Sequence, residues 1–198
     1  PNDIAVSREN GVLYVYVVLN GNSRCRKIRW SDRSTVWESR TGMAPFGLAL
    51  AKGKLYVSNW AGPVPPEGTD RETAGIPYGK VYIDPRTGAT AEGTVSIFDA
   101  ANGKLLKEIR VGLHPNAILA APDGQTVFVA NGNSDNVSVI STATDVVTDS
   151  IAIRLSGDDA FIGDSPDGLA IDGRGKTLYV SAGMDNAVAV VDLANKNK

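Results

Sequence analysis

Residues 114–131 read HPNAILAAPDGQTVFVAN and set the pattern that the rest of the chain repeats. Two runs rich in Val, Ile, Leu and Phe flank Asp123-Gly124, a dipeptide that favours a tight turn between antiparallel strands. Two further β-type runs follow after short polar turns. The segment therefore predicts four short strands, over residues 116–121, 126–131, 136–141 and 146–153.

The same pattern recurs along the chain with a period of about 42 residues. Prolines equivalent to Pro115 stand at Pro1, Pro45 and Pro166. The third strand is clear in three of the repeats and degraded in the first, where it is expected near residues 28–32. Four strands in such a period make one blade of a β-propeller. We predict an all-β propeller of four-stranded antiparallel blades, at about residues 1–43, 44–112, 113–153 and 165–193.

Two insertions interrupt the period. The larger occupies residues 63–92, between the second and third strands of the second blade, and the smaller lies between residues 141 and 166. Successive turns of an antiparallel blade open on alternate faces, so both insertions and the loop before Pro115 are expected on one face. Binding residues concentrate on such loops. The candidate binding residues are Trp60, Arg71, Tyr78, His114 and Asn116.

Candidates for catalysis and metal binding are few. His114 is the only histidine and Cys25 the only cysteine, which excludes a Cys/His zinc cluster and an internal disulfide. His114 suits either a general base or a packing residue of the repeat, and no partner for catalysis is evident. We predict no catalytic residue and no cofactor. Calcium is a minor alternative, because the smaller insertion holds oxygen ligands at Asp158, Asp159 and Asp164. Their spacing does not match an EF-hand, and a solvated acidic loop is the other interpretation.

Composition limits the possible partners. The chain has 198 residues, a formal charge of −2 and a pI of about 5.4. A nucleic-acid-binding protein generally carries a net basic surface or patch, so no nucleic acid is expected. No apolar run approaches the roughly 20 residues of a membrane span.

Some motifs resemble a known family. The third repeat resembles the YVTN-type propeller repeat, through HPN (114–116), PDG (122–124), VFVAN (127–131) and SDNVSVI (134–140). VSNWAG (57–62), DPRTG (84–88) and GTVSI (93–97) resemble a bacterial group in which such a propeller precedes an alkaline-phosphatase-like phosphoesterase domain. The resemblance implies a non-catalytic module in a secreted or periplasmic protein. It would serve as an interaction or substrate-gating platform for a fused or partner hydrolase.

Two other functions remain open. Lactone-hydrolysing propellers share the His-Pro-Asn and Pro-Asp-Gly pattern of residues 114–124, and surface-layer or adhesion proteins are also built from such repeats. A ring of this repeat type usually needs about seven blades, with four as the lower limit. We therefore expect the chain to form about half of a ring. Its open edges would be covered by further blades or by self-association.

Overall fold

A computed structural model describes residues 1–154 and 163–195. The first sheet contains β1 (Ile4–Glu9), β2 (Val12–Leu19), β3 (Arg24–Arg29) and β4 (Thr35–Arg40), with a short 3-10 turn, η1 (Asn20–Asn22), between β2 and β3. The second contains β5 (Pro45–Ala51), β6 (Lys54–Asn59), β9 (Gly93–Asp99) and β10 (Leu105–Val111). The third contains β11 (Pro115–Ala120), β12 (Thr126–Asn131), β13 (Asn136–Ser141) and β14 (Val146–Ala152). The fourth contains β15 (Pro166–Ile171), β16 (Thr177–Ala182) and β17 (Ala187–Asp192).

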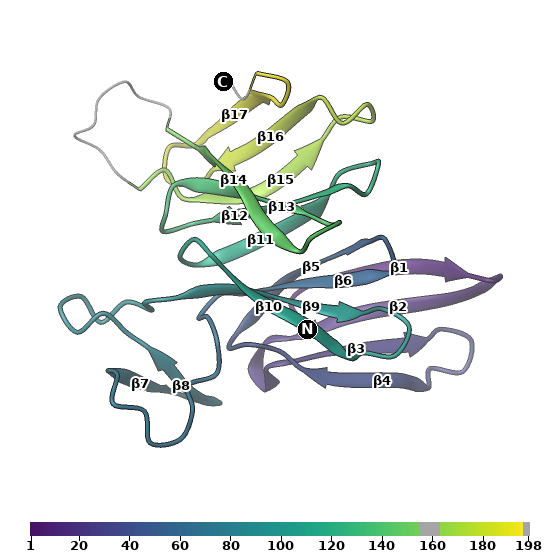
Figure 1. Cartoon of the computed structure of the whole chain (residues 1–198), viewed down its shortest axis with the longest axis horizontal. Coiled ribbons are helices and arrows are strands. Elements are labelled where there is room, and N and C mark those ends of the chain that lie inside the picture. Colours follow the sequence, from purple (N-terminus) through teal and green to yellow (C-terminus); the bar gives the residue numbers. More distant parts are fainter. Residues whose placement is uncertain (155–162, 196–198) are drawn as a thin grey trace.

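The sheets are arranged as the blades of a propeller (Figure 1). Within each sheet the strands are antiparallel and run in chain order, and the first strands of successive sheets contact one another: β1 with β5, β5 with β11, and β11 with β15. The predicted fold class is confirmed, and the four strands of the third repeat lie within a residue or so of their predicted positions. No helix in the described ranges is long and apolar enough to cross a membrane.

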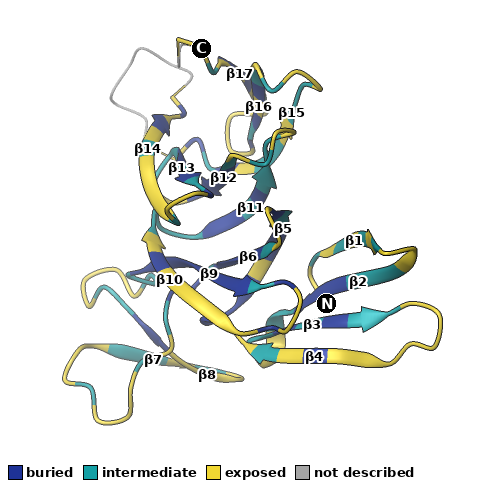
Figure 2. Cartoon of the chain, turned by 45° about the vertical axis from the view of Figure 1, so that its right-hand side comes forward, coloured by how far each residue is buried: buried dark blue, intermediate teal, exposed yellow. Residues whose placement is uncertain are grey.

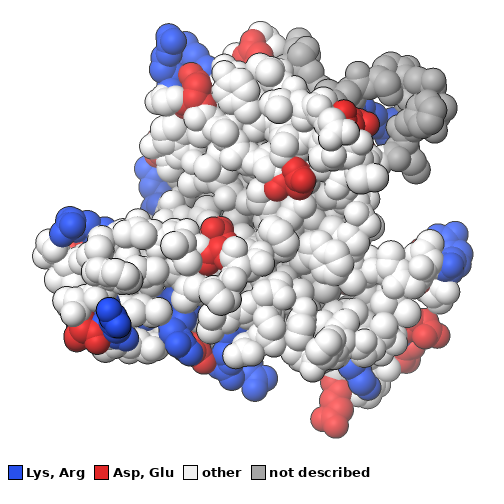
Figure 3. Space-filling model, turned by 180° about the vertical axis from the view of Figure 1, so that it is seen from behind, with Lys and Arg blue, Asp and Glu red and all other residues white. Residues whose placement is uncertain are grey.

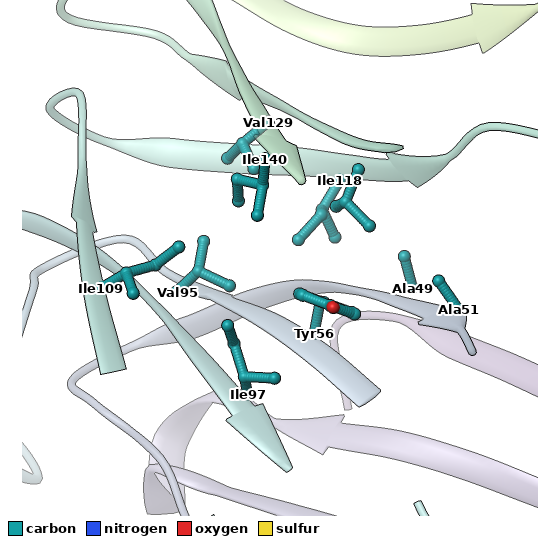
Figure 4. Packing of buried hydrophobic residues seen from close by; sticks show 10 residues of the cluster. Ala49, Ala51, Tyr56, Val95, Ile97, Ile109, Ile118, Val129 and Ile140 are labelled. Atoms are coloured by element: carbon teal, nitrogen blue, oxygen red, sulfur yellow. The ribbon is translucent and has the colours of Figure 1, made fainter. Parts of the chain in front are cut away.

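Apolar side chains fill the space between neighbouring sheets. Figure 4 shows Tyr56 and Ile97 of the second sheet facing Ile118, Val129 and Ile140 of the third. A second cluster joins the first and second sheets, and a third cluster joins the third and fourth. Figure 2 shows the consequence: burial is concentrated where sheets face each other, and the outer strands β4, β10 and β14 are largely exposed.

Hydrogen bonds at two turns add to this packing. The C=O of Ala100, in the turn between β9 and β10, accepts from Tyr16 Oη at 3.1 Å and from Trp37 Nε1 at 3.1 Å, both in the first sheet. In the next sheet, Tyr56 Oη donates to Asp145 Oδ1 at 2.7 Å and Lys54 Nζ lies 2.6 Å from Asp145 Oδ2. Burial, and then the Asp145 carboxylate, raises the pKa of Tyr56, so its hydroxyl stays protonated and donates.

The structure departs from the sequence prediction in two places. The third strand of the first sheet is β3 (Arg24–Arg29), not residues 28–32. Asp32 explains the shift, because its Oδ1 accepts from the N–H and the hydroxyl of Ser34 and closes a turn there. The larger insertion is not simply a loop: it contains a hairpin of β7 (Thr73–Ile76) and β8 (Gly79–Tyr82).

Replacing Tyr56 with Phe tests the tie between the second and third sheets. We expect the free energy of unfolding to fall by about 1–2 kcal/mol, because the hydrogen bond to a charged acceptor is lost while Lys54 still pairs with Asp145. Chemical denaturation measures the free energy of unfolding. Tyr179 stands at the equivalent position of β16 and is 41% exposed, so Tyr179→Phe should change stability by less than about 0.5 kcal/mol. Equal losses in the two variants would contradict the role given to Tyr56.

Candidate functional site

The larger insertion is fastened to the body of the molecule where it begins. Residues 60–62, which lead into it, run beside the connection between β4 and β5. Three backbone hydrogen bonds join the two segments: Met43 N–H to Gly62 C=O at 2.8 Å, Trp60 N–H to Ala44 C=O at 3.0 Å, and Ala61 N–H to Met43 C=O at 3.2 Å. Gly62 has φ +79, and a Cβ there would lie 2.8 Å from Glu92 Cβ. The start and the end of the insertion therefore lie against each other.

The insertion has a small apolar core of its own. Met43, Ala44, Ala61 and Val81 are all buried in one cluster, and Ala74, Ile76 and Ile83 pack against it. Gly79 lies close to this cluster, because a Cβ there would stand 2.7 Å from Met43 Cε. Burial of this kind is what holds a short hairpin in place, since an isolated two-stranded hairpin is marginally stable in water.

A buried carboxylate closes the far end of the insertion. Glu92 is only 5% exposed, and its Oε1 pairs with Arg71 of the insertion and with Arg110 of β10, the latter at 3.2 Å. The Arg71 guanidinium also lies over the ring of Tyr82, 3.8 Å from its centroid. The side chains of Arg71 and Arg110 are 47% and 75% exposed, so the carboxylate is the buried member of this cluster. Glu92 therefore ties the β7–β8 hairpin to the second blade.

His114 ties the insertion to the third blade. Its ring stacks on Trp60 with 4.0 Å between centroids and 15° between planes, and its Nε2 contacts the hydroxyl of Thr90. Burial lowers the pKa of His114 below its ordinary value, and an interaction with Asn133 opposes the shift. The lowered pKa favours the neutral form of the ring. One face and one nitrogen of the imidazole are engaged in contacts that position the insertion.

A cavity of about 580 Å³ opens between the insertion and the ends of β3 and β4. Tyr78 lines it, and its hydroxyl donates to Asn20 Oδ1 at 3.2 Å. The insertion also contributes Val64, Pro65, Pro66 and Lys80 to its wall, and the first sheet contributes Arg24 and Arg40. The cavity is a preformed recess lined by both basic and apolar residues.

The structure brings some of the predicted binding residues together and separates others. Trp60 contacts His114, whereas Arg71 pairs with Glu92 and Tyr78 lines the cavity. Asn116 is buried in β11, and its backbone C=O accepts from Ser58 Oγ at 2.6 Å.

Of the three aspartates named as possible calcium ligands, only Asp164 lies among the described residues. Asp158 and Asp159 lie outside the described residues. Asp164 is 7% exposed, so it does not belong to a fully solvated loop, and its C=O accepts from Met184 N–H at 3.3 Å. Within residues 1–154 and 163–195, no group of three His, Cys, Asp or Glu side chains is placed to hold a metal.

Charge is distributed unevenly over the molecule. Figure 3, seen from behind, shows few charged side chains over the centre, with Lys and Arg mostly near the margins. The strands β5 and β11 contain no charged residue, and β15 contains only Asp167. No sequence pattern indicates the basic residues of the cavity wall. Arg24, Arg40 and Lys80 come from separate parts of the chain, and no motif joins them.

The fold is that of known β-propellers. No protein-family model and no curated protein matches the sequence. Among solved structures, hydrazine synthase from Kuenenia stuttgartiensis is 22% identical, with a TM-score of 0.70 over 99% of this chain. A functionally unknown protein from Desulfotomaculum acetoxidans DSM 771 is 16% identical, with a TM-score of 0.61 over 96% of the chain. Dihydro-heme d1 dehydrogenase NirN, in complex with DHE, is 14% identical, with a TM-score of 0.58 over 91%. The chain spans 47%, 51% and 35% of those proteins, and the likeness is one of fold.

The only histidine offers a test of how the insertion is held. Because burial lowers the pKa of His114 from 6.5, the unfolded chain binds the proton first as the pH falls. The stability due to neutral His114 is complete above pH 6.5 and is lost progressively below it, down through the lowered pKa. We expect the melting temperature to fall between about pH 7 and pH 5.5, above the range where carboxylates titrate. His114→Gln should flatten that slope. An unchanged slope in the variant would show that other groups cause it.

Proposed function

We propose that the chain is a non-catalytic β-propeller module of the YVTN type whose insertion-bearing face is a docking and substrate-gating platform for a phosphoesterase domain. The observation that carries the proposal is that the insertion has an ordered structure fixed to the propeller. It is a structured hairpin held at Glu92 and His114, and it walls a cavity on one face of the propeller. A long segment fixed in this way presents a defined surface, and binding to a preorganised surface requires little further ordering.

The contacts of His114 favour binding over hydrolysis. A general base needs a free nitrogen within hydrogen-bond reach of the substrate proton. Nε2 of His114 contacts Thr90, and the ring is covered on one side by Trp60. These contacts are those of a residue that positions a loop. They give the lactonase interpretation no support.

The identity of the partner rests on sequence resemblance. The motifs on either side of the insertion, VSNWAG (57–62) and GTVSI (93–97), form β6 and β9 and the turn that follows β6. They are the strands from which the insertion emerges. The resemblance to propellers that precede an alkaline-phosphatase-like domain therefore involves the scaffold of the proposed docking face. It also supports a secreted or periplasmic location.

A binding experiment tests the proposal. The probe is a purified alkaline-phosphatase-like phosphoesterase domain from the resembled bacterial group, with the chain immobilised for biolayer interferometry. One variant replaces residues 64–91 with a short Gly-Ser linker. A second, Glu72→Lys with Arg86→Glu, exchanges two exposed charges of the insertion and leaves its core intact. We expect both to weaken binding, the first by at least about tenfold.

A matched control exchanges charges on the opposite face. Lys104→Glu with Asp123→Lys also leaves the net charge unchanged. Both positions are exposed, next to turns on the face opposite the insertion. It should bind as the intact chain does. If the linker variant does not fold, the variant with exchanged charges on the insertion shows whether this face binds the phosphoesterase domain. The proposal is overturned if that exchange and its control bind equally well. It is also overturned if the intact chain hydrolyses lactones and His114→Ala abolishes the activity.

A further inference from the structure

We propose that the cavity beneath the insertion binds a small phosphate monoester through the side chains of Arg24, Arg40 and Lys80. The inference rests on the proposed function, because it names the ligand class that the insertion-bearing face would gate. Three features of the cavity wall suit such a ligand: an opposed pair of arginines, an excess of positive charge, and apolar lining residues.

Arg24 and Arg40 stand directly opposite each other on neighbouring strands. They are register partners in the antiparallel pair of β3 and β4, and both line the cavity. Like charges directly opposite on one face of a sheet are destabilising. An anion between the two guanidinium groups would remove that repulsion, and the planar guanidinium binds phosphate in a bidentate manner.

The charge of the wall is not balanced by the chain itself. Glu38 lies 3.1 Å from Arg24 through Oε1, but its other oxygen pairs with Arg26, so one carboxylate serves two arginines. Among the residues that the structure describes, neither Arg40 nor Lys80 makes an ion pair, and Glu67 is the only acidic residue lining the cavity. The cavity therefore offers two cations in excess of its local carboxylates.

Lys80 adds a third positive charge to the cavity wall. It lies on β8, paired in register with Gly75 of β7. Its position depends on the hairpin contacts described above, because Gly79 next to it packs on Met43. The insertion thus brings a third cation to a site whose other two belong to the first sheet.

The rest of the wall suits an organic group. Met43, Val64, Pro65, Pro66 and the ring of Tyr78 line the cavity beside the cations. Val64 is 54% exposed and Tyr78 40% exposed, so these apolar surfaces are available to a ligand. A phosphate monoester combines the two requirements, since it carries a charge of about −1.5 to −2 at pH 7 together with an organic substituent.

Isothermal titration calorimetry of the full chain with three probes tests the inference. Phenyl phosphate is the principal probe, phenyl sulfate has the same shape with one charge, and inorganic phosphate lacks the ring. We expect phenyl phosphate to bind at least about fivefold more tightly than either of the others, and more weakly as salt is added. Equal affinity for phenyl phosphate and phenyl sulfate, or no binding of phenyl phosphate, would overturn the inference.

Variants locate the binding site. Arg40→Gln and Lys80→Gln should each weaken phenyl phosphate binding by about tenfold, because each removes a charge-assisted contact. The matched controls are Arg174→Gln in the turn between β15 and β16 and Lys107→Gln on β10, both exposed and outside the cavity. They should bind as the intact chain does. If the control variants weaken binding as much as Arg40→Gln does, phenyl phosphate is attracted by the overall charge of the protein, and the proposed binding site is wrong.

The stability of the ligand-free variant gives an independent readout. Arg40→Gln removes one of two opposed charges, so its melting temperature should equal or exceed that of the intact chain. A lower melting temperature would contradict the argument from repulsion. The partner experiment remains separate, because Arg40→Gln keeps the whole insertion. If the phosphoesterase domain docks but phenyl phosphate does not bind, the ligand class is wrong and the docking platform stands. If phenyl phosphate binds but the domain does not dock, the platform is wrong and the ligand class stands.

Discussion

The structure depends on one constraint: each sheet of a propeller has two apolar faces and cannot be stable alone. The second sheet buries Leu55, Val57 and Phe98 against the first and Tyr56, Val95 and Ile97 against the third. Packing at both faces fixes the angle between blades, and the bonds to Ala100 and Asp145 reinforce it at the turns. At the two outermost sheets, Ile4, Val6, Val188 and Val190 are more than half exposed. Such a face is suited to packing against another sheet.

The rigidity of the second blade is what allows an insertion between its middle strands to be a defined structure. The strands β6 and β9 pair along their whole length, so the insertion leaves and returns at two adjacent fixed points. From there Glu92 joins it to β10, and His114 joins it to the loop before β11. The cavity exists because the hairpin is held away from the first sheet at a fixed distance. Its mixed basic and apolar lining follows from which residues β3, β4 and β8 present there.

The sequence analysis predicted the parts of this structure that repeat. The turn at Asp123-Gly124 and the runs around it locate β11 to β14 within about a residue, because local turn chemistry and side-chain alternation decide them. The contact between Trp60 and His114 follows from the prediction that their loops share a face. The β7–β8 hairpin and the cavity could not be predicted. Residues 73–82 lack strong alternation, and only tertiary packing brings Lys80 to the cavity that Arg24 and Arg40 line as register partners of β3 and β4. Asn116 is buried in β11, which sequence alone could not indicate, because a conspicuous motif position can serve either binding or packing.

The central claim is that the insertion is a fixed part of the fold, and native-state hydrogen exchange tests it most directly. The amides of β7 and β8 that bond across the hairpin, and those of Met43 and Ala61, should exchange at least about a hundredfold more slowly than in an unstructured peptide. Exchange of these amides at the unprotected rate, while β6 and β9 remain protected, would contradict the account. The insertion would then be a mobile loop, and the cavity would not be preformed.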